Sequence, residues 1–204
     1  MVVKSQARVL PGSFSTAGIY RADNSSILPA SDELSANEAF EAAKGALGAK
    51  TLSGLKAVYE EGAMQKTILN YSIQRWQKLF GIVVEATPAP ASQIPSLLAS
   101  GQYQLAVCSV SPSENSAFSA LSQYARNSSG AGAVVEDEGF LGILSQAAQS
   151  PDKQREAEQY LINQHLVMPL YYTKKYFVFS KTVVNPALDL FSATVDFTGT
   201  GIYD

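Results

Sequence analysis

The chain has 204 residues, of which 46% are hydrophobic and 16% are charged. Such a chain is long enough to bury one good core or two small ones, and its composition is that of a globular protein. The formal net charge of −3 offers no basic stripe that could neutralise a phosphate backbone. Neither nucleic acid nor an anionic membrane surface is therefore expected as a partner.

Cys108 is the one cysteine of the sequence, which excludes an internal disulfide framework and any cysteine-rich metal site. Because it follows the apolar residues 105–107, we expect a buried and inert thiol. No apolar run approaches the ~20 residues of a membrane span, and the first residues lack the pattern of a signal peptide. We expect a soluble chain, either a mature form or an excised piece of a longer protein.

The first half of the chain is expected to alternate helices and strands. After a loop rich in Gly, Ser and Pro, a helix is expected over 31–48, with Ser31 as its N-cap and Gly48 as its stop. A strand is expected over 51–62. The next helix is expected over 64–80, where apolar residues recur at the three- and four-residue steps of a buried helix face, namely Met64, Ile68, Leu69, Ile73, Trp76, Leu79 and Phe80.

A second strand begins at residue 82, and Pro88 and Pro90 are expected to terminate it. A short helix over 92–100 then leads to a strand over 102–110. Helices of this length between short apolar strands favour right-handed parallel crossovers over a helix bundle. We therefore expect an α/β fold with a mixed, mainly parallel sheet flanked by helices.

The second half is expected to be more helical, with helices over 117–125, 136–150 and 151–165. Pro151 suits the first turn of the last of these helices, where its missing N–H costs nothing. An aromatic, β-branched segment over 168–184 is expected to form a strand that rejoins the sheet. The tail beyond it has no helical period.

No motif in the sequence supports an enzymatic function, a cofactor or a metal site. His165 is the one histidine, and at a helix end it more often partners the helix dipole or packs as a side chain. No His-x-x-x-His, GxSxG or Walker-type pattern occurs, and the carboxylates lack metal-loop spacing. The acidic cluster 136–138 is typical of a helix start rather than of a site.

Aromatic residues gather in the segment 170–179, where they could line a cleft or pack in the core. They are Tyr171, Tyr172, Tyr176, Phe177 and Phe179. Lys174 and Lys175 interrupt the segment, and we expect them at a solvent-facing turn of the sheet edge.

Residues 103–118, YQLAVCSVSPSENSAF, run from an apolar strand to a polar tip. Such a tip can be an ordinary loop. It can also be a ligand site, because parallel strands hold their ligands beyond their carboxyl ends and loops on a rigid base often carry function. The part from Ser109 to Asn115 offers backbone N–H groups, hydroxyls, one carboxylate and one amide, and is the best candidate site.

Three stretches in series resemble the second lobe of the peptide-binding (oligopeptide, dipeptide or nickel) class of ABC-importer solute-binding proteins. They are ILNYSIQRWQKLFGIVVE, then IPSLLASGQYQLAVCSV, then SPDKQREAEQYLINQHLVMPLYYTKKYFVFS. The family has a helix ending in Trp and Gly-Ile before a strand, a Gly-x-Tyr-x-x-Ala strand before the binding segment, and a charged helix before a Pro-Leu-Tyr-Tyr strand. The match covers about residues 7–185 in the right order.

The resemblance implies one lobe of a type II periplasmic-binding-protein-like fold. Residues 1–204 would form a single α/β lobe, with a core over about 7–182 and a tail over 183–204 that returns to a missing first lobe. Members of the family are extracytoplasmic, commonly lipid-anchored, and close around an oligopeptide or related solute for delivery to a permease. The resemblance thus implies a peptide or small solute, an N-terminal lobe and an ABC permease as partners, and the charge argues against nucleic acid.

The chain departs from the family at one point. Many oligopeptide-binding relatives carry a Trp and an Asp after the Tyr-x-x-Ala strand, and the Asp pairs with the α-ammonium of the peptide. Here these positions hold Val110 and Ser113, and Glu114 is the nearest carboxylate. Either Glu114 substitutes, or the ligand is not held by a free N-terminus. The expected ligand-binding residues are Ser109, Val110, Ser111, Ser113, Glu114, Asn115 and Tyr171.

Two other interpretations stay open. The first is a cell-surface interaction or sensor domain, without a transport role, that docks a partner through the aromatic segment 170–179. The second is a hydrolase that uses Glu114 or a serine, for which the sequence offers the weakest case.

Overall fold

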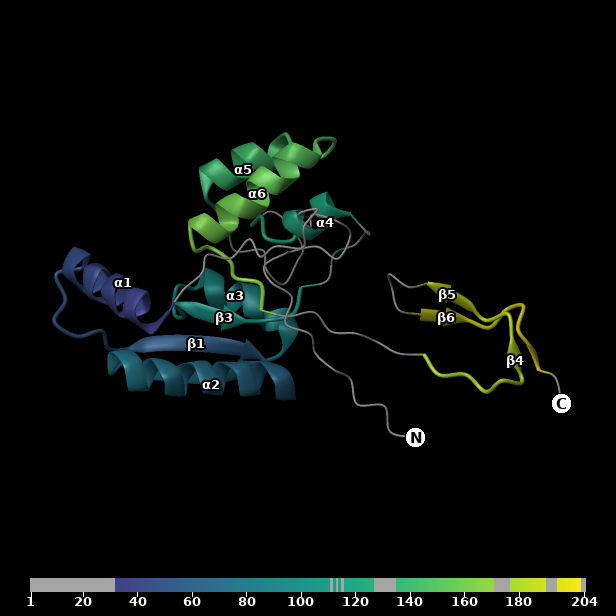
Figure 1. Cartoon of the computed structure of the whole chain (residues 1–204), viewed down its shortest axis with the longest axis horizontal. Helices are drawn as coiled ribbons and strands as arrows, with labels where there is room; N and C mark the ends of the chain where they lie inside the picture. The colour runs from purple at the N-terminus through teal and green to yellow at the C-terminus, as the bar shows by residue number, and fades with distance from the viewer. Residues whose placement is uncertain are drawn as a thin grey trace.

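The computed structural model of the protein describes residues 32–110, 112, 114, 116–126, 135–170, 177–189 and 194–202. Three strands, β1 (Leu55–Glu60), β2 (Val84–Ala89) and β3 (Leu105–Val107), form a parallel sheet in the order β2-β1-β3. Helices lie on both faces of this sheet (Figure 1). The predicted α/β class with a mainly parallel sheet is confirmed.

The central strand β1 is buried on both faces, and its alternating side chains build two cores. Ala57 and Tyr59 pack with Leu69 of α2 (Ala63–Phe80). Val58 points the other way and packs with Ile94 of α3 (Ile94–Ala99), which follows the short 3-10 turn η1 (Ala91–Gln93). A strand covered on both faces is expected to be apolar throughout, as Ala57, Val58 and Tyr59 are.

The helix predicted over 64–80 is confirmed as α2. Ile73 and Trp76 pack against the core between α2 and the sheet, as the apolar spacing predicts. The helix ends at Gly81, whose φ of 67° lies in the left-handed region that glycine adopts without strain.

The first and third strands are shorter than predicted, and the end of the second strand also differs from the prediction. Pro88 does not terminate the second strand, because β2 runs to Ala89 and Pro88 is in register with Tyr59. The strand order places β2 at an edge of the described sheet. An edge strand turns part of its N–H groups away from its neighbour, so a proline without an N–H is tolerated there.

The first described helix, α1 (Glu33–Ala46), is capped by Asp32 rather than by Ser31, which lies outside the described residues. The Asp32 carboxylate accepts the backbone N–H of Ser35 at 2.8 Å, and the Ser35 hydroxyl accepts the N–H of Asp32 at 3.1 Å. Asp is as good an N-cap as Ser, so the two cannot be told apart by residue type alone. The predicted stop at Gly48 agrees with its left-handed φ of 62°.

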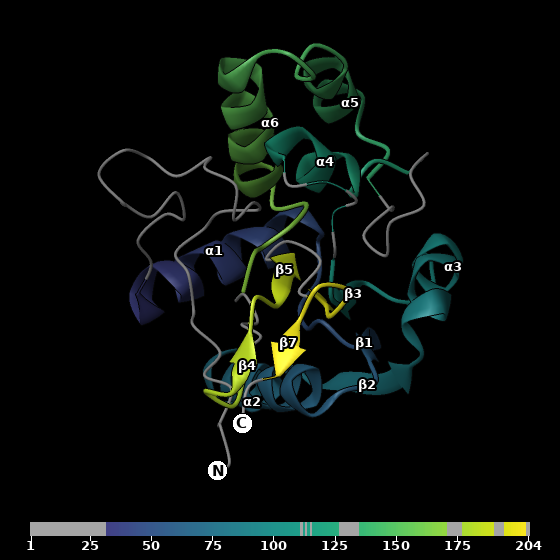
Figure 2. The ribbon, with the colours of Figure 1, turned by 90° about the vertical axis from the view of Figure 1, so that its right-hand side faces the viewer.

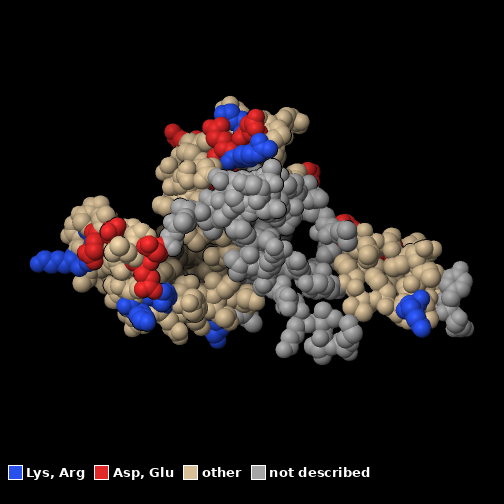
Figure 3. Space-filling view, viewed as in Figure 1, with Lys and Arg blue, Asp and Glu red and all other residues tan. Residues whose placement is uncertain are grey.

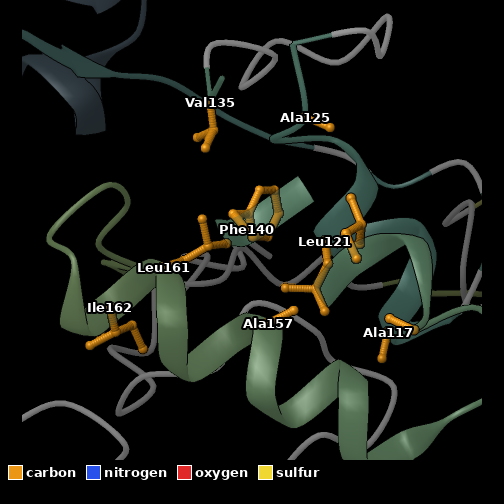
Figure 4. Packing of buried hydrophobic residues seen from close by; sticks show 10 residues of the cluster. Ala117, Leu121, Ala125, Val135, Phe140, Ala157, Leu161 and Ile162 are labelled. Atoms are coloured by element: carbon orange, nitrogen blue, oxygen red, sulfur yellow. The ribbon is translucent and has the colours of Figure 1, made fainter. Parts of the chain in front are cut away.

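Three helices form a second packed unit beside the sheet: α4 (Ala117–Ser122), α5 (Glu138–Ser145) and α6 (Pro151–Asn163). Phe140 of α5 and Leu161 of α6 are fully buried at its centre together with Leu121 of α4, as Figure 4 shows. The three helices predicted here are confirmed. Among the residues that the structure describes, the buried side chains therefore form several small cores rather than a single large one.

Both helix starts that the sequence predicts in this unit are confirmed. The Asp137 carboxylate accepts the N–H of Phe140 at 2.9 Å, so the acidic cluster caps α5. Pro151 lies in the first turn of α6, with Ser150 as the N-cap.

His165 lies just beyond the end of α6, in the left-handed conformation with φ 55°. Its N–H donates to the Ile162 carbonyl at 3.0 Å, and the N–H of Leu166 donates to the Leu161 carbonyl at 2.9 Å. This pair of bonds is the Schellman arrangement that closes a helix. The histidine side chain is exposed. His165 therefore ends the helix through its backbone conformation and is not a packed core residue.

The predicted strand over 168–184 is wrong for its described part. Residues 177–182 form no strand, and β4 (Val183–Val184) pairs antiparallel with β7 (Gly201–Ile202) instead of joining the parallel sheet. β5 (Ala187–Asp189) and β6 (Thr194–Asp196) form another antiparallel pair. β-branched and aromatic residues favour a pleated surface but do not select a partner strand. Lys174 and Lys175 lie outside the described residues.

The segment from β4 to β7 lies to one side of the helices and the parallel sheet (Figure 1), and Figure 2 shows β4 and β7 side by side. Phe179 contacts Phe177 and Phe197, with ring centroids 6.4 and 6.3 Å apart. In the view of Figure 3, charged side chains gather over the α1–α2 end and over α5 and α6, whereas this segment is largely uncharged.

Candidate functional site

The carboxyl ends of the three parallel strands meet at one edge of the sheet. Glu60, the last residue of β1, is in register with Ala89, the last residue of β2. Val107, the last residue of β3, is in register with Tyr59. In open α/β sheets this is the edge at which ligands bind. The polar segment that begins at Ser109 leaves the sheet at this edge.

Ser109 is held from two sides at this edge. Its backbone N–H donates to Glu60 Oε2 at 2.6 Å, and its Oγ accepts a hydrogen bond from Gln65 Nε2 at 3.0 Å. The ladder between β1 and β3 ends at Val107, so side chains of β1 and α2 take over where the backbone pairing stops. A carboxylate that accepts an N–H forms a short, strong hydrogen bond.

Gln65 reaches Ser109 because α2 begins at the same edge. Gly62 is the N-cap of α2 and has no side chain to cap the helix. Gln65, one turn into the helix, folds back over it, so that a Cβ added at Gly62 would lie 3.2 Å from Gln65 Cδ. The missing side chain of Gly62 therefore leaves room for the Gln65 amide beside the site.

Cys108 lies directly before Ser109 and is half-buried. Burial raises the pKa of its thiol to about 11, and the negative charge of Glu60 adds to the rise. The thiol is therefore protonated at neutral pH and is a poor nucleophile. This agrees with the inert thiol predicted from the sequence, although the residue is less buried than expected.

The far end of the polar segment is attached to α4. The backbone N–H of Glu114 donates to Ser119 Oγ at 3.1 Å, and its carbonyl accepts the N–H of Ser116 at 2.8 Å. Ser116 in turn caps α4 by accepting the N–H of Ser119 at 3.1 Å. The backbone of Glu114 is thus fixed while its side chain is exposed.

The structure describes some of the predicted site residues and not others. Ser109 and Glu114 are exposed, and Val110 is half-buried. The remaining four lie outside the described residues: Ser111, Ser113, Asn115 and Tyr171. The sequence analysis missed Glu60 and Gln65. The rule that singled out Ser109, a polar residue after the carboxyl end of a strand, also applies to Glu60 and could have found it.

The fold of the chain is that of part of several peptide-binding proteins of known structure. One is the pheromone receptor PrgZ, whose structure was described together with its mode of peptide binding. It is 20% identical, with a TM-score of 0.68, and the match covers 98% of this chain and 40% of that one. The substrate-binding domain of an oligopeptide ABC transporter from Bacillus anthracis str. Ames is 16% identical, with a TM-score of 0.67. This match covers 97% of this chain and 41% of that one. Peptide-bound OppA from Listeria monocytogenes is 17% identical, with a TM-score of 0.61. This match covers 85% of this chain and 34% of that one.

The chain thus spans about 40% of the length of the first two of these proteins. The likeness confirms the predicted lobe of a periplasmic-binding-protein-like fold. The similar structures are described as peptide-binding or substrate-binding proteins. No family model and no curated protein matches the sequence.

In the part of the chain that the structure describes, no helix combines the length and the hydrophobicity that crossing a lipid bilayer requires. Over the same residues, His, Cys, Asp and Glu side chains nowhere gather in a group of three that could hold a metal ion.

Proposed function

We propose that the chain is one lobe of the substrate-binding protein of an ABC importer and supplies one face of a cleft that captures a peptide or a related small solute. The observation that carries this proposal is the tethered polar segment from Ser109, at the carboxyl edge of a parallel sheet whose fold matches peptide-binding proteins. Exposed hydroxyl and carboxylate groups on a rigid base are suited to hydrogen bonding a polar ligand.

The ligand contacts proposed from this chain are Ser109, Val110, Ser111, Ser113, Glu114, Asn115 and Tyr171. The exposed Glu114 supports a role as an acidic group of the site, because its backbone is fixed and its carboxylate faces solvent. Neither a cofactor nor a metal is part of the proposal. The proposal also includes a first lobe and an ABC permease as partners. It places the protein outside the cytoplasm, held by a lipid anchor.

Capture is proposed to occur by closure of two lobes, which excludes water around the solute. Residues 1–204 would act as a single lobe whose tail over 183–204 returns to the first lobe. Binding energy is then shared across the cleft, so this chain alone should bind weakly.

Calorimetry of the 204-residue chain with a pool of random pentapeptides tests this proposal. We expect measurable binding with a dissociation constant weaker than about 1 μM, which corresponds to ~8 kcal/mol. No heat at millimolar peptide would contradict peptide binding. Sub-micromolar affinity of this chain alone would contradict a shared cleft.

A second candidate, a protein interaction domain, is favoured by one observation. Met168, just before the aromatic segment, and Val178, within it, are 66% and 65% exposed, and exposed apolar residues can mark a docking surface. Substituting Tyr171 and Tyr172 with charged residues would abolish binding of a partner protein in this case. In the transport case the same change lowers the stability of the fold and, through Tyr171, weakens binding of the peptide, but it abolishes no protein–protein contact.

A further inference from the structure

Ser109 has one hydrogen-bonding group, its hydroxyl hydrogen, for which the described residues provide no acceptor. Its N–H is bound to the Glu60 carboxylate and its Oγ accepts the Gln65 amide. A serine hydroxyl has one hydrogen to donate and two lone pairs. Within the part of the chain that the structure describes, no acceptor takes the hydroxyl hydrogen. The side chain is exposed, so this hydrogen is available to a molecule outside the protein.

Both groups that hold Ser109 belong to rigid elements. Glu60 ends the central strand and directly follows the buried Tyr59. Gln65 lies in the first turn of the 18-residue helix α2, and like Glu60 it is half-buried. Side chains on a strand and a helix hold their partner more accurately than side chains on a loop do. The position of Ser109 is therefore set before any ligand arrives.

We infer that Ser109 donates its hydroxyl hydrogen to an acceptor oxygen of the ligand, of the kind that every peptide carries in its main-chain carbonyls. Glu60 and Gln65 are positioning residues that act through Ser109. This inference deepens the proposed function and rests on it. Because main-chain carbonyls are common to all peptides, the contact at Ser109 favours peptides without selecting among their side chains.

The donor role is tested with the Ser109→Ala and Ser109→Thr variants of the 204-residue chain, titrated with the same pentapeptide pool. Loss of one hydrogen bond weakens peptide affinity about fivefold in Ser109→Ala. The threonine hydroxyl restores affinity to within about twofold of the original. Ser145→Ala is the matched control, because Ser145 is an exposed serine of α5 whose hydroxyl donates to the Gly142 carbonyl of its own helix at 2.8 Å. Unchanged affinity in Ser109→Ala would overturn the donor role.

The positioning role is tested without a ligand, through the hydrogen exchange rate of the Ser109 amide. Exchange should be faster in Glu60→Ala and little changed in Glu60→Gln, since the glutamine amide oxygen can accept the same N–H. Peptide affinity should follow the same order. Equal exchange rates in Glu60→Ala and the original chain would overturn the positioning role. If the original chain binds no peptide, the proposed function and the donor role fail together, while the exchange rates still decide whether Glu60 holds Ser109.

Discussion

Glu60 and Ser109 are 49 residues apart in the sequence, yet a carboxylate oxygen of one accepts the backbone N–H of the other at 2.6 Å. The bond joins the carboxyl end of the central strand to the start of the polar segment. It places a negative charge close to Cys108, whose pKa it helps to raise. The reactivity of this thiol therefore reports on the state of the site.

Cys108 should react slowly with a disulfide reagent at neutral pH and faster as the pH approaches about 11, the pKa of its thiol. About one molecule in ten thousand carries the thiolate at pH 7. Glu60→Gln removes a negative charge that disfavours the thiolate, so it should lower the pKa and speed the reaction. The rate of thiol modification measured against pH checks both statements, and a thiol that reacts fully within seconds at pH 7 would contradict them.

Phe140→Ala should destabilise the helical unit severely. Phe140 is fully buried between α4, α5 and α6, and replacing a buried phenylalanine by alanine costs about 3–5 kcal/mol. Urea unfolding measures the loss. Leu34→Ala is the control, because Leu34 is 69% exposed and its truncation should change the free energy of unfolding by less than about 0.5 kcal/mol. Equal effects of the two changes would refute the assigned core.

The helix α1 has no buried residue and is held to α2 by a few contacts. The rings of Phe40 and Phe80 stack with their centroids 4.6 Å apart, and Glu33 forms an ion pair with Arg75. Phe40→Ala should make local opening of α1 easier by about 1 kcal/mol. Hydrogen exchange should then speed up across α1 and stay unchanged in α5 and α6. Faster exchange over the whole protein would show that α1 supports more than its own position.

Stability should fall in acid through the cap of α5. The N–H of Phe140 and the hydroxyl of Tyr160 both donate to Asp137 and hold the pKa of its carboxyl below the ordinary value of 3.8. A carboxyl with a lowered pKa in the folded state stabilises the fold above its unfolded pKa, and this contribution is lost as the pH falls through the folded pKa.

Melting temperatures between pH 7 and pH 2 test this dependence. Asp137→Asn keeps a good N-cap but cannot titrate, so the variant should lose less stability in acid than the original chain does. Identical pH profiles for the two proteins would exclude Asp137 as a source of the acid sensitivity.

The elements that could be predicted from the sequence are those with their own periodicity or caps. The spacing of Leu69, Ile73 and Trp76 fixes one face of α2, and local polar residues mark the starts of α5 and α6. The order of short apolar strands and helices indicates the parallel sheet. Each helix signal lies within about 20 residues of the sequence, so it can be recognised without knowledge of which segments meet in the fold.

The features that could not be predicted depend on which segments meet. The tolerance of Pro88 follows from the edge position of β2, and the pairing of β4 with β7 follows from tertiary contacts that β-propensity does not encode. At the site, Ser109 was found because it follows an apolar strand. Its partners Glu60 and Gln65 come from two other elements, and only the fold brings them to the same edge.

The most direct test of peptide binding at the carboxyl edge of the sheet is an NMR titration of the isotope-labelled 204-residue chain with the pentapeptide pool. We expect the amide signals that shift to belong to Glu60, Gln65, Ser109, Val110 and Glu114. Shifts confined to α5 and α6 or to the segment from β4 to β7, with this edge unaffected, would contradict the proposed site.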